Sequence, residues 1–222
     1  MEAGVRPGDD VVVPAFGGAR VAEAVRTLGA RPVFADIEPR SFCLDPKSAA
    51  AVVTERCTAI APVHLFGHPA DMVCLRALAQ ERGLAVVEFG AVPPVVSVDV
   101  VRRRQHAAYL DRRLSGVVKP SVAQGVEHAY EEYVVRIPGN GRPDRDAFKR
   151  ALRRRGVECW VPVKAAVHRM AGFRSEVQLP EAERAAEECL ALPVDVSMSR
   201  RDLQRVVSAC NALGGLLMEP AC

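Results

Sequence analysis

The stretch that decides the fold is residues 6–39, which read RPGDDVVVPAFGGARVAEAVRTLGARPVFADIEP. Two apolar runs, 11–14 and 32–35, flank a segment, 19–28, whose apolar residues recur at helical spacing. The alternation continues with apolar runs at 58–63 and 84–88 and helical patterns at 45–55 and 71–82. Continuous apolar strands separated by helices are typical of a parallel sheet covered on both faces. The pattern therefore predicts an α/β fold.

Residues at the predicted helix ends support these boundaries. Asp45 and Asp71 precede helical patterns and are predicted N-caps, because a carboxylate there accepts hydrogen bonds from free backbone N–H groups. Gly29 and Gly83 follow helical patterns, where a left-handed glycine commonly ends a helix.

The rest of the chain has a different order of expected strands and helices, which indicates a second, smaller domain. Residues 89–101 break the pattern, and 102–114 read as one helix. Beyond it we expect a strand, a basic helix, an extended run and two closing helices, at 130–137, 145–155, 157–163, 179–191 and 200–213. We therefore expect a large domain over 1–114 and a small C-terminal α/β domain over 115–222.

Composition excludes several classes of function. The chain has 222 residues, 49% of them hydrophobic and 26% charged, which is ordinary for a globular protein. A net charge of +3 and 5% aromatic residues give little reason to expect nucleic-acid binding. No run approaches the roughly 20 apolar residues of a membrane span, and the start lacks the apolar core of a signal peptide. Seven cysteines without a C-x-x-C pair favour a reducing compartment, so we expect a cytoplasmic protein.

Four stretches together resemble one known family. They are residues 6–39, residues 62–91 (PVHLFGHPADMVCLRALAQERGLAVVEFGA), residues 156–168 (GVECWVPVKAAVH) and residues 179–193 (LPEAERAAEECLALP). The family is the DegT/DnrJ type of nucleotide-sugar aminotransferases, which has the fold type I architecture. The resemblance implies a pyridoxal-phosphate enzyme that moves an amino group, usually from glutamate, onto a keto-sugar linked to a nucleoside diphosphate. Such sugars enter antibiotic glycosides and surface polysaccharides.

The Schiff-base lysine that the resemblance implies has no counterpart in the sequence. In the family it follows the acidic motif after further strands, whereas here residues 88–92 lead directly into the helix VRRRQHAAYLDRRL at 101–114. The chain has four lysines, Lys47, Lys119, Lys149 and Lys164, and none has the surroundings of the family's lysine. We expect each of them to be a solvated surface residue.

The other cofactor positions of the family are also changed. The acidic motif E-D-A-A-Q corresponds to residues 88–92, so that Phe89 replaces the aspartate that pairs with the pyridine nitrogen and Val92 replaces the glutamine. Gly18 stands where the family has the aromatic residue over the ring, and the phosphate-binding helix start would precede residue 1. Glu88 cannot substitute for the aspartate because adjacent strand side chains point to opposite faces. We expect no covalently bound cofactor and no catalytic residue.

Two further candidates are weighed against structural roles. His168 matches the histidine that closes the family's H-Y-P-x-P-L-H loop and is a candidate substrate-binding residue, although a lone loop histidine is commonly a structural hydrogen-bonding group. His64 and His68 have a zinc-like spacing, but Gly67 and Pro69 oppose a helical pair, so we expect no metal site.

The sequence thus predicts an incomplete large domain, with about four of the family's seven strands, whose open edge invites pairing with another chain. Our first hypothesis is a degenerate, non-catalytic homologue, either an accessory subunit of an intact aminotransferase or a remnant. Alternatives are an active transaminase that shares residues with a partner chain, and a binding module for a nucleotide-sugar. A heterodimer with an intact homologue and a homodimer both remain open.

Overall fold

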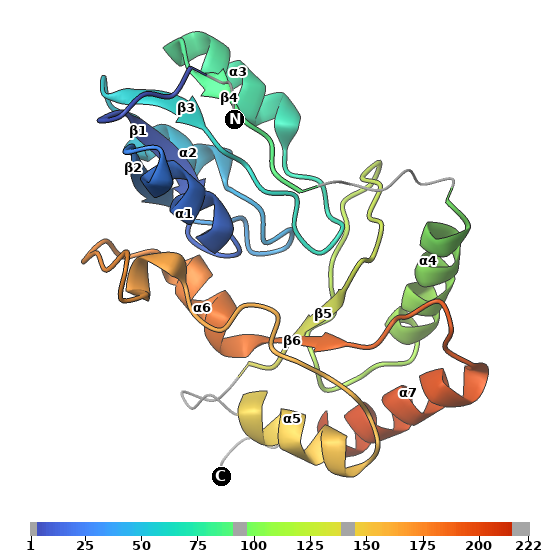
Figure 1. The fold of residues 1–222 in the computed structure, drawn as a ribbon. Coiled ribbons are helices and arrows are strands. Elements are labelled where there is room, and N and C mark those ends of the chain that lie inside the picture. The colour runs from blue at the N-terminus through green and yellow to red at the C-terminus, as the bar shows by residue number, and fades with distance from the viewer. Residues whose placement is uncertain (1–3, 91–96, 139–144, 215–222) are drawn as a thin grey trace. The chain divides into compact units, whose positions relative to one another are not determined.

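The computed structural model describes residues 4–90, 97–138 and 145–214, and the chain forms two compact units (Figure 1). One unit combines Met1–Val92 with Ala165–Ala186, and the other combines Pro93–Lys164 with Glu187–Cys222. These units differ from the expected domains, 1–114 and 115–222. The helix expected at 102–114 belongs to the second unit, and a later segment returns to the first.

The first unit contains a four-stranded parallel sheet. Its strands are β1 (Asp10–Pro14), β2 (Arg31–Ala35), β3 (Cys57–Ile60) and β4 (Ala85–Val86), in the order β2-β1-β3-β4. All three pairings are parallel, as the alternation of strands and helices predicts. Every residue of β1 is buried because this strand lies inside the sheet. The parallel sheet of the expected α/β fold is confirmed.

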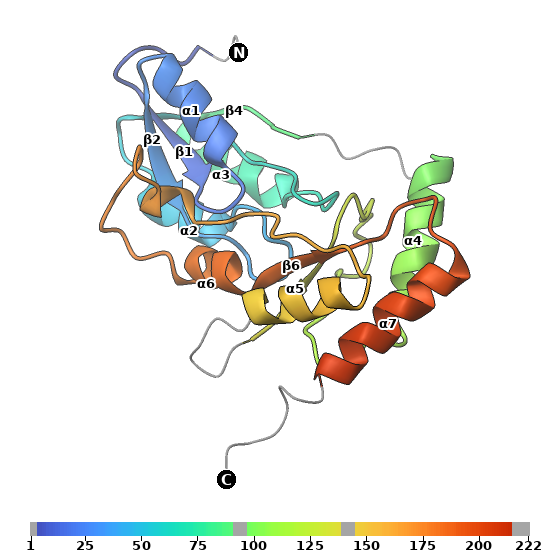
Figure 2. The same ribbon diagram turned by 60° about the horizontal axis from the view of Figure 1, so that its bottom comes forward.

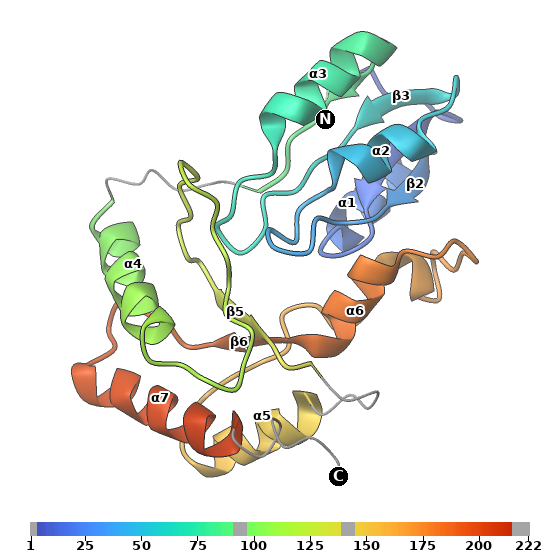
Figure 3. The same ribbon diagram turned by 180° about the vertical axis from the view of Figure 1, so that it is seen from behind.

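Three helices cover the two faces of this sheet. Figure 3 shows α2 (Pro46–Val52) and α3 (Met72–Arg82) on one face and α1 (Ala19–Thr27) on the other. Between the sheet and α2 and α3 lies an apolar core that includes Val12, Ile60 and Leu75. The predicted caps are confirmed: Asp45 accepts from two backbone N–H groups of α2, Asp71 accepts from Cys74 N, and Gly83 ends α3 in the left-handed conformation.

A segment from later in the chain completes the first unit. It contains a short 3₁₀ helix, η1 (Val167–Arg169), and the start of α6 (Pro180–Glu188). The N–H of Val167 donates to the carbonyl of Ala15 at 2.7 Å, which joins η1 to the loop after β1.

The second unit is built on an antiparallel pair of strands. Strand β5 (Tyr133–Arg136) pairs with β6 (Cys189–Leu192), and α4 (Val98–Asp111), α5 (Arg145–Arg154) and α7 (Arg200–Gly214) belong to the same unit. Side chains of both strands and all three helices share one core, in which Leu110, Leu152 and Leu190 are fully buried.

Two expectations for the second half need correction. The helix expected over 179–191 ends at Glu188, and the buried residues from Cys189 onward form β6, because pairing with β5 outweighs their helical spacing. The extended run expected over 157–163 has a single bridge to the sheet, between Trp160 and Ala191. None of the helices in the described residues has the length and apolar character that crossing a membrane requires.

Removing the hydroxyl of Tyr133 tests the second core. The ring is fully buried, and its OH donates to Asp111 Oδ1 at 2.5 Å. We expect Tyr133→Phe to lower the free energy of unfolding by about 1–3 kcal/mol, because a hydrogen bond to a charged acceptor is lost. Urea denaturation measures the change. The control, Tyr109→Phe on α4, removes a hydroxyl and keeps the ring that packs under Arg113, so its effect should stay within about 0.5 kcal/mol. Equal effects of both variants would contradict this account.

Candidate functional site

Three of the sequence-predicted positions, Gly18, His64 and Phe89, follow the carboxyl ends of strands β1, β3 and β4. Ligands of open parallel sheets bind outside the carboxyl ends of the strands, so this edge is the natural candidate site. Three phenylalanine rings fill it: Phe16 packs 5.9 Å from Phe42 and 6.2 Å from Phe66, measured between ring centroids. All three are buried. The edge near β1 is therefore closed by apolar side chains.

Gly18 occupies the position at which the family's stacking aromatic is expected. It is the N-cap of α1, and a Cβ built on its backbone would lie 2.2 Å from the carbonyl oxygen of Pro14. No real side chain tolerates that contact, so the backbone at this position accepts only glycine. An aromatic residue here would require the turn between β1 and α1 to move.

Phe89 continues strand β4. Its N–H donates to Pro62 O and its carbonyl accepts from His64 N, both at 2.9 Å. Its side chain is half-buried and carries no group that could hold a proton against a pyridine nitrogen. Val92, the other changed position of the acidic motif, lies outside the described residues.

Glu88 is engaged in a local network. It accepts from Arg76 on α3 at 2.5 Å and lies 3.4 Å from His64 Nε2. The hydrogen bond from Arg76 holds the pKa of Glu88 below its ordinary value, and the contact with His64 lowers it further. His64 Nδ1 in turn accepts from the N–H of Ala70, so its proton is on Nε2, facing the carboxylate. Glu88 is thus an ionised carboxylate paired toward α3.

His64 and His68 both serve the turn after β3. His68 bonds the carbonyl of Pro69 through Nδ1 at 2.7 Å, and its backbone exchanges two hydrogen bonds with Leu65. Phe66 and Gly67 at the tip have positive φ angles of 60° and 84°. The described residues contain no group of three metal-capable side chains.

The four lysines are divided between the two units: Lys47 belongs to the first unit and the other three to the second. Lys47, Lys119 and Lys164 are exposed, and Lys149 is half-buried on α5. Lys119 Nζ donates to the backbone carbonyl of Asp111 at 2.7 Å. Within the described part of the chain none of the four forms an ion pair with a carboxylate.

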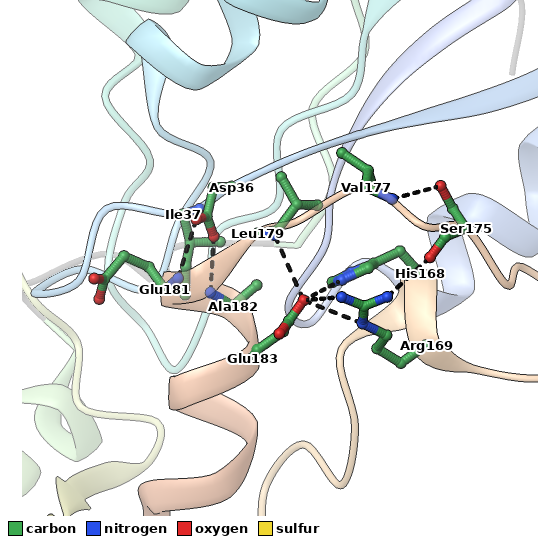
Figure 4. Close-up of polar contacts among 10 residues, drawn as sticks. All are labelled: Asp36, Ile37, His168, Arg169, Ser175, Val177, Leu179, Glu181, Ala182 and Glu183. Carbon is green, nitrogen blue, oxygen red and sulfur yellow. Dashed lines mark hydrogen bonds and ion pairs between the residues drawn. The ribbon is translucent and has the colours of Figure 1, made fainter.

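His168 is the buried member of a polar cluster with Glu183 and Arg169 within the first unit (Figure 4). It is fully buried, packs 6.4 Å from the Phe34 ring, and bonds Glu183 Oε1 through Nε2 at 2.9 Å. A carboxylate only accepts, so Nε2 carries the proton, and Nδ1 has no partner among the described residues. This geometry is that of a structural hydrogen-bonding group. Substrate binding by His168 stays a prediction.

Glu183 is the centre of this cluster, and sequence reasoning missed it. Besides His168, it accepts from Arg169 NH2 at 2.6 Å and Arg169 Nε at 3.1 Å. The hydrogen bond from His168 holds the pKa of Glu183 below its ordinary value, with further lowering by Arg169.

Asp36, at the end of β2, was also missed. Its two oxygens accept from the N–H groups of Glu181 and Ala182 at 3.0 and 2.7 Å, so it caps α6 from a distant part of the chain (Figure 4). A signal existed in the sequence: residues 177–179, before Pro180, include no Ser, Thr, Asp or Asn to serve as a local cap.

Comparison with known proteins places the chain in a family. The sequence model of the DegT/DnrJ/EryC1/StrS aminotransferase family matches residues 1–91 and 96–211. The chain belongs to this family. Its members are pyridoxal-phosphate-dependent aminotransferases, as the resemblance of the four stretches implied.

Individual relatives cover different shares of the chain. A pleiotropic regulatory protein of Geobacillus stearothermophilus is 28% identical over 296 residues, which take in 92% of this chain and 78% of that protein. A dTDP-3-amino-3,4,6-trideoxy-alpha-D-glucose transaminase of Micromonospora megalomicea is 36% identical over 154 residues, or 68% of this chain and 37% of the enzyme. The chain thus spans little more than a third of the latter.

A solved structure shows the same fold. NtdA from Bacillus subtilis, determined with bound cofactor PMP, matches with a TM-score of 0.83 at 19% identity, over 96% of this chain and 69% of that one. The expected fold type I architecture is therefore confirmed for this aminotransferase-family chain.

The described residues do not fit the family's cofactor. Pyridoxal phosphate needs an amine for the Schiff base and an acid for the ring nitrogen. Three of the four lysines are exposed and none pairs with a carboxylate, Phe89 offers no acid, and Gly18 has no room for a ring. No reaction step through the cofactor follows from these residues.

Substituting Glu183 tests the polar cluster. A lowered pKa means that the stabilisation is fully present above the unfolded value, near 4.3, and is lost as the pH falls through the folded value. We expect Glu183→Gln to lower the free energy of unfolding by about 1–3 kcal/mol at neutral pH and by much less at acidic pH. Urea denaturation at several pH values measures this. The control on the same helix is the exposed Glu187→Gln, and an effect of Glu183→Gln that is independent of pH would contradict the assignment.

Substituting Gly18 tests the closed turn at the stacking position. We expect Gly18→Ala to destabilise the chain by about 1–3 kcal/mol, because the new methyl group meets the Pro14 carbonyl. Gly172→Ala is the control, since its methyl group would meet a side-chain end, the Arg26 guanidinium at 3.0 Å, and no backbone atom, so we expect a smaller effect. Thermal unfolding followed by circular dichroism compares them, and a neutral Gly18→Ala would show that the turn has room.

Proposed function

We propose that this chain is a non-catalytic member of the aminotransferase family, which forms no Schiff base and does not transaminate by itself. We further propose that it acts in the cytoplasm as an accessory partner of an intact sugar aminotransferase. The pathway would be nucleotide-aminosugar synthesis for polysaccharides or antibiotics.

The observation that carries the proposal is where the family match breaks. The match to the family model stops at residue 91 and resumes at residue 96. This break follows the acidic motif directly, at the point where the family's lysine-bearing stretch is expected. The match to the Geobacillus protein runs over 296 positions although 92% of this 222-residue chain takes part, so that relative has a long internal stretch without a counterpart here. The placement of the four lysines agrees with the loss of that stretch.

The edge of the sheet supports the partner role. Within the described residues β4 pairs only with β3, and residues 84–87 are each half-buried, in contrast to the fully buried β1. Parallel sheets are normally covered on both faces, and an open edge binds other chains. An intact relative or a second copy of this chain could cover it, and shared ancestry favours the intact relative.

The two alternatives have less support. An active transaminase with a lysine lent by a partner would still lack the acid at Phe89 and the ring-stacking residue at Gly18. A nucleotide-sugar binding module depends on His168, which is fully buried and bonded to Glu183.

Co-expression separates these possibilities. Three samples are compared for amination of a nucleotide-linked keto-sugar: an intact relative alone, that relative with this chain, and a relative whose Schiff-base lysine is replaced by alanine, with this chain. We expect the chain to co-purify with the relative and the third sample to be inactive. Amination in the third sample would show that this chain supplies a lysine, and a failure to co-purify would contradict the partner role.

A further inference from the structure

A groove runs along the outer edge of β2, on the far side of the sheet from β4. Its volume is about 690 Å³, and its walls come from β2, the end of α1 and the loop after η1. Figure 2 shows this loop, in orange, beside β2. All the lining residues belong to the first unit. No step of the proposed function uses this groove.

The groove is positively charged. Arg26, Arg31 and Arg174 line it, and among the described residues no Asp or Glu does. Arg31 is paired with Asp10 at 2.5 Å, whereas Arg26 and Arg174 have no carboxylate partner in the described part of the chain. The groove thus offers two uncompensated guanidinium groups to an anionic ligand.

Contacts within the first unit hold the Arg26 side of the groove in place. The Arg26 guanidinium lies 4.7 Å above the Phe173 ring and donates to the carbonyl of Gly172 at 3.2 Å. Phe173 packs edge-to-face on Phe34 with centroids 5.9 Å apart. Less conformational entropy is lost on binding when the guanidinium is held in place.

The loop that carries Phe173 is anchored in turn. Ser175 N donates to the carbonyl of His168 at 2.9 Å, and Arg169 NH1 donates to the carbonyl of Ser175 at 3.0 Å. The polar cluster around Glu183 therefore also supports this wall of the groove.

The shape of the groove selects an extended ligand. Five consecutive residues, 30–34, line it, so it follows the backbone of an edge strand. Exposed strand edges bind extended peptides, but Pro32 in this stretch has no N–H to donate, so side chains contribute most of the contacts to an extended ligand here. The half-buried Val33 and the partly exposed Val177 supply apolar contacts, and the arginines supply charge.

We infer that this groove docks an extended segment of a partner protein in which carboxylate and apolar side chains alternate. The inference is independent of the proposed lack of catalysis, since it uses no residue of the cofactor site.

Binding of a fluorescein-labelled peptide of alternating glutamate and valine to the full chain tests this, by fluorescence anisotropy. We expect saturable binding that weakens severalfold between about 0.05 and 0.5 M salt. Replacing both Arg26 and Arg174 by glutamine should weaken it at least about tenfold. The control Arg20→Gln, an exposed arginine of α1 that does not line the groove, should change it less than about twofold.

A second variant, Val177→Glu, keeps the test valid if the double variant loses its fold. It places a carboxylate at a partly exposed position in the groove and should abolish binding while circular dichroism stays unchanged. The inference is overturned if the peptide does not bind, if a lysine–valine peptide binds equally well, or if Val177→Glu binds normally. Displacement by single-stranded DNA at equal concentration would also overturn it, because any polyanion would then suffice.

Discussion

Successive side chains of a strand point to opposite faces of the sheet, and this constraint decides which residue after β4 could supply an acid to a ligand. The carboxylate of Glu88 is bound by Arg76 on α3 and by His64 in the turn after β3, and in an extended strand the side chain of the next residue points to the opposite face. That residue is Phe89. A carboxylate one position away cannot replace the missing acid without a shift in register, which the hydrogen bonds of Phe89 to Pro62 and His64 oppose. Phe89 thus stands at the position that the family resemblance assigns to the acid, in a backbone whose strand pairing is retained.

The fold persists because other contacts hold the two stretches of the first unit together. Asp36 caps α6, Val167 bonds the loop after β1, and Glu183 binds His168 and Arg169. These contacts join residues far apart in sequence and none needs a cofactor. The architecture of the first unit is therefore held by contacts within the chain itself.

Much of the fold could be predicted from the sequence because its signals are local. The strand–helix alternation, the caps at Asp45 and Asp71 and the left-handed Gly83 depend on neighbouring residues. Strand β6 was predicted as helix because its pairing with β5 lies more than fifty positions away in the chain. The cap from Asp36 and the hub at Glu183 were missed for the same reason. The interpretation of Gly18 and Phe89 depends on comparison with a family pattern, and the structure adds that a side chain at position 18 would meet the Pro14 carbonyl.

The central claim is that no lysine of this chain holds pyridoxal phosphate. Incubation of the full chain with the cofactor, reduction with borohydride and peptide mapping by mass spectrometry test it most directly. Reduction converts a Schiff base into a stable secondary amine, so a specific site would appear as one stoichiometrically labelled lysine. The account predicts only trace labelling, spread over Lys47, Lys119, Lys149 and Lys164. When loosely bound cofactor is washed away before reduction, no labelling should remain. Stoichiometric labelling of a single lysine that survives the wash would contradict it.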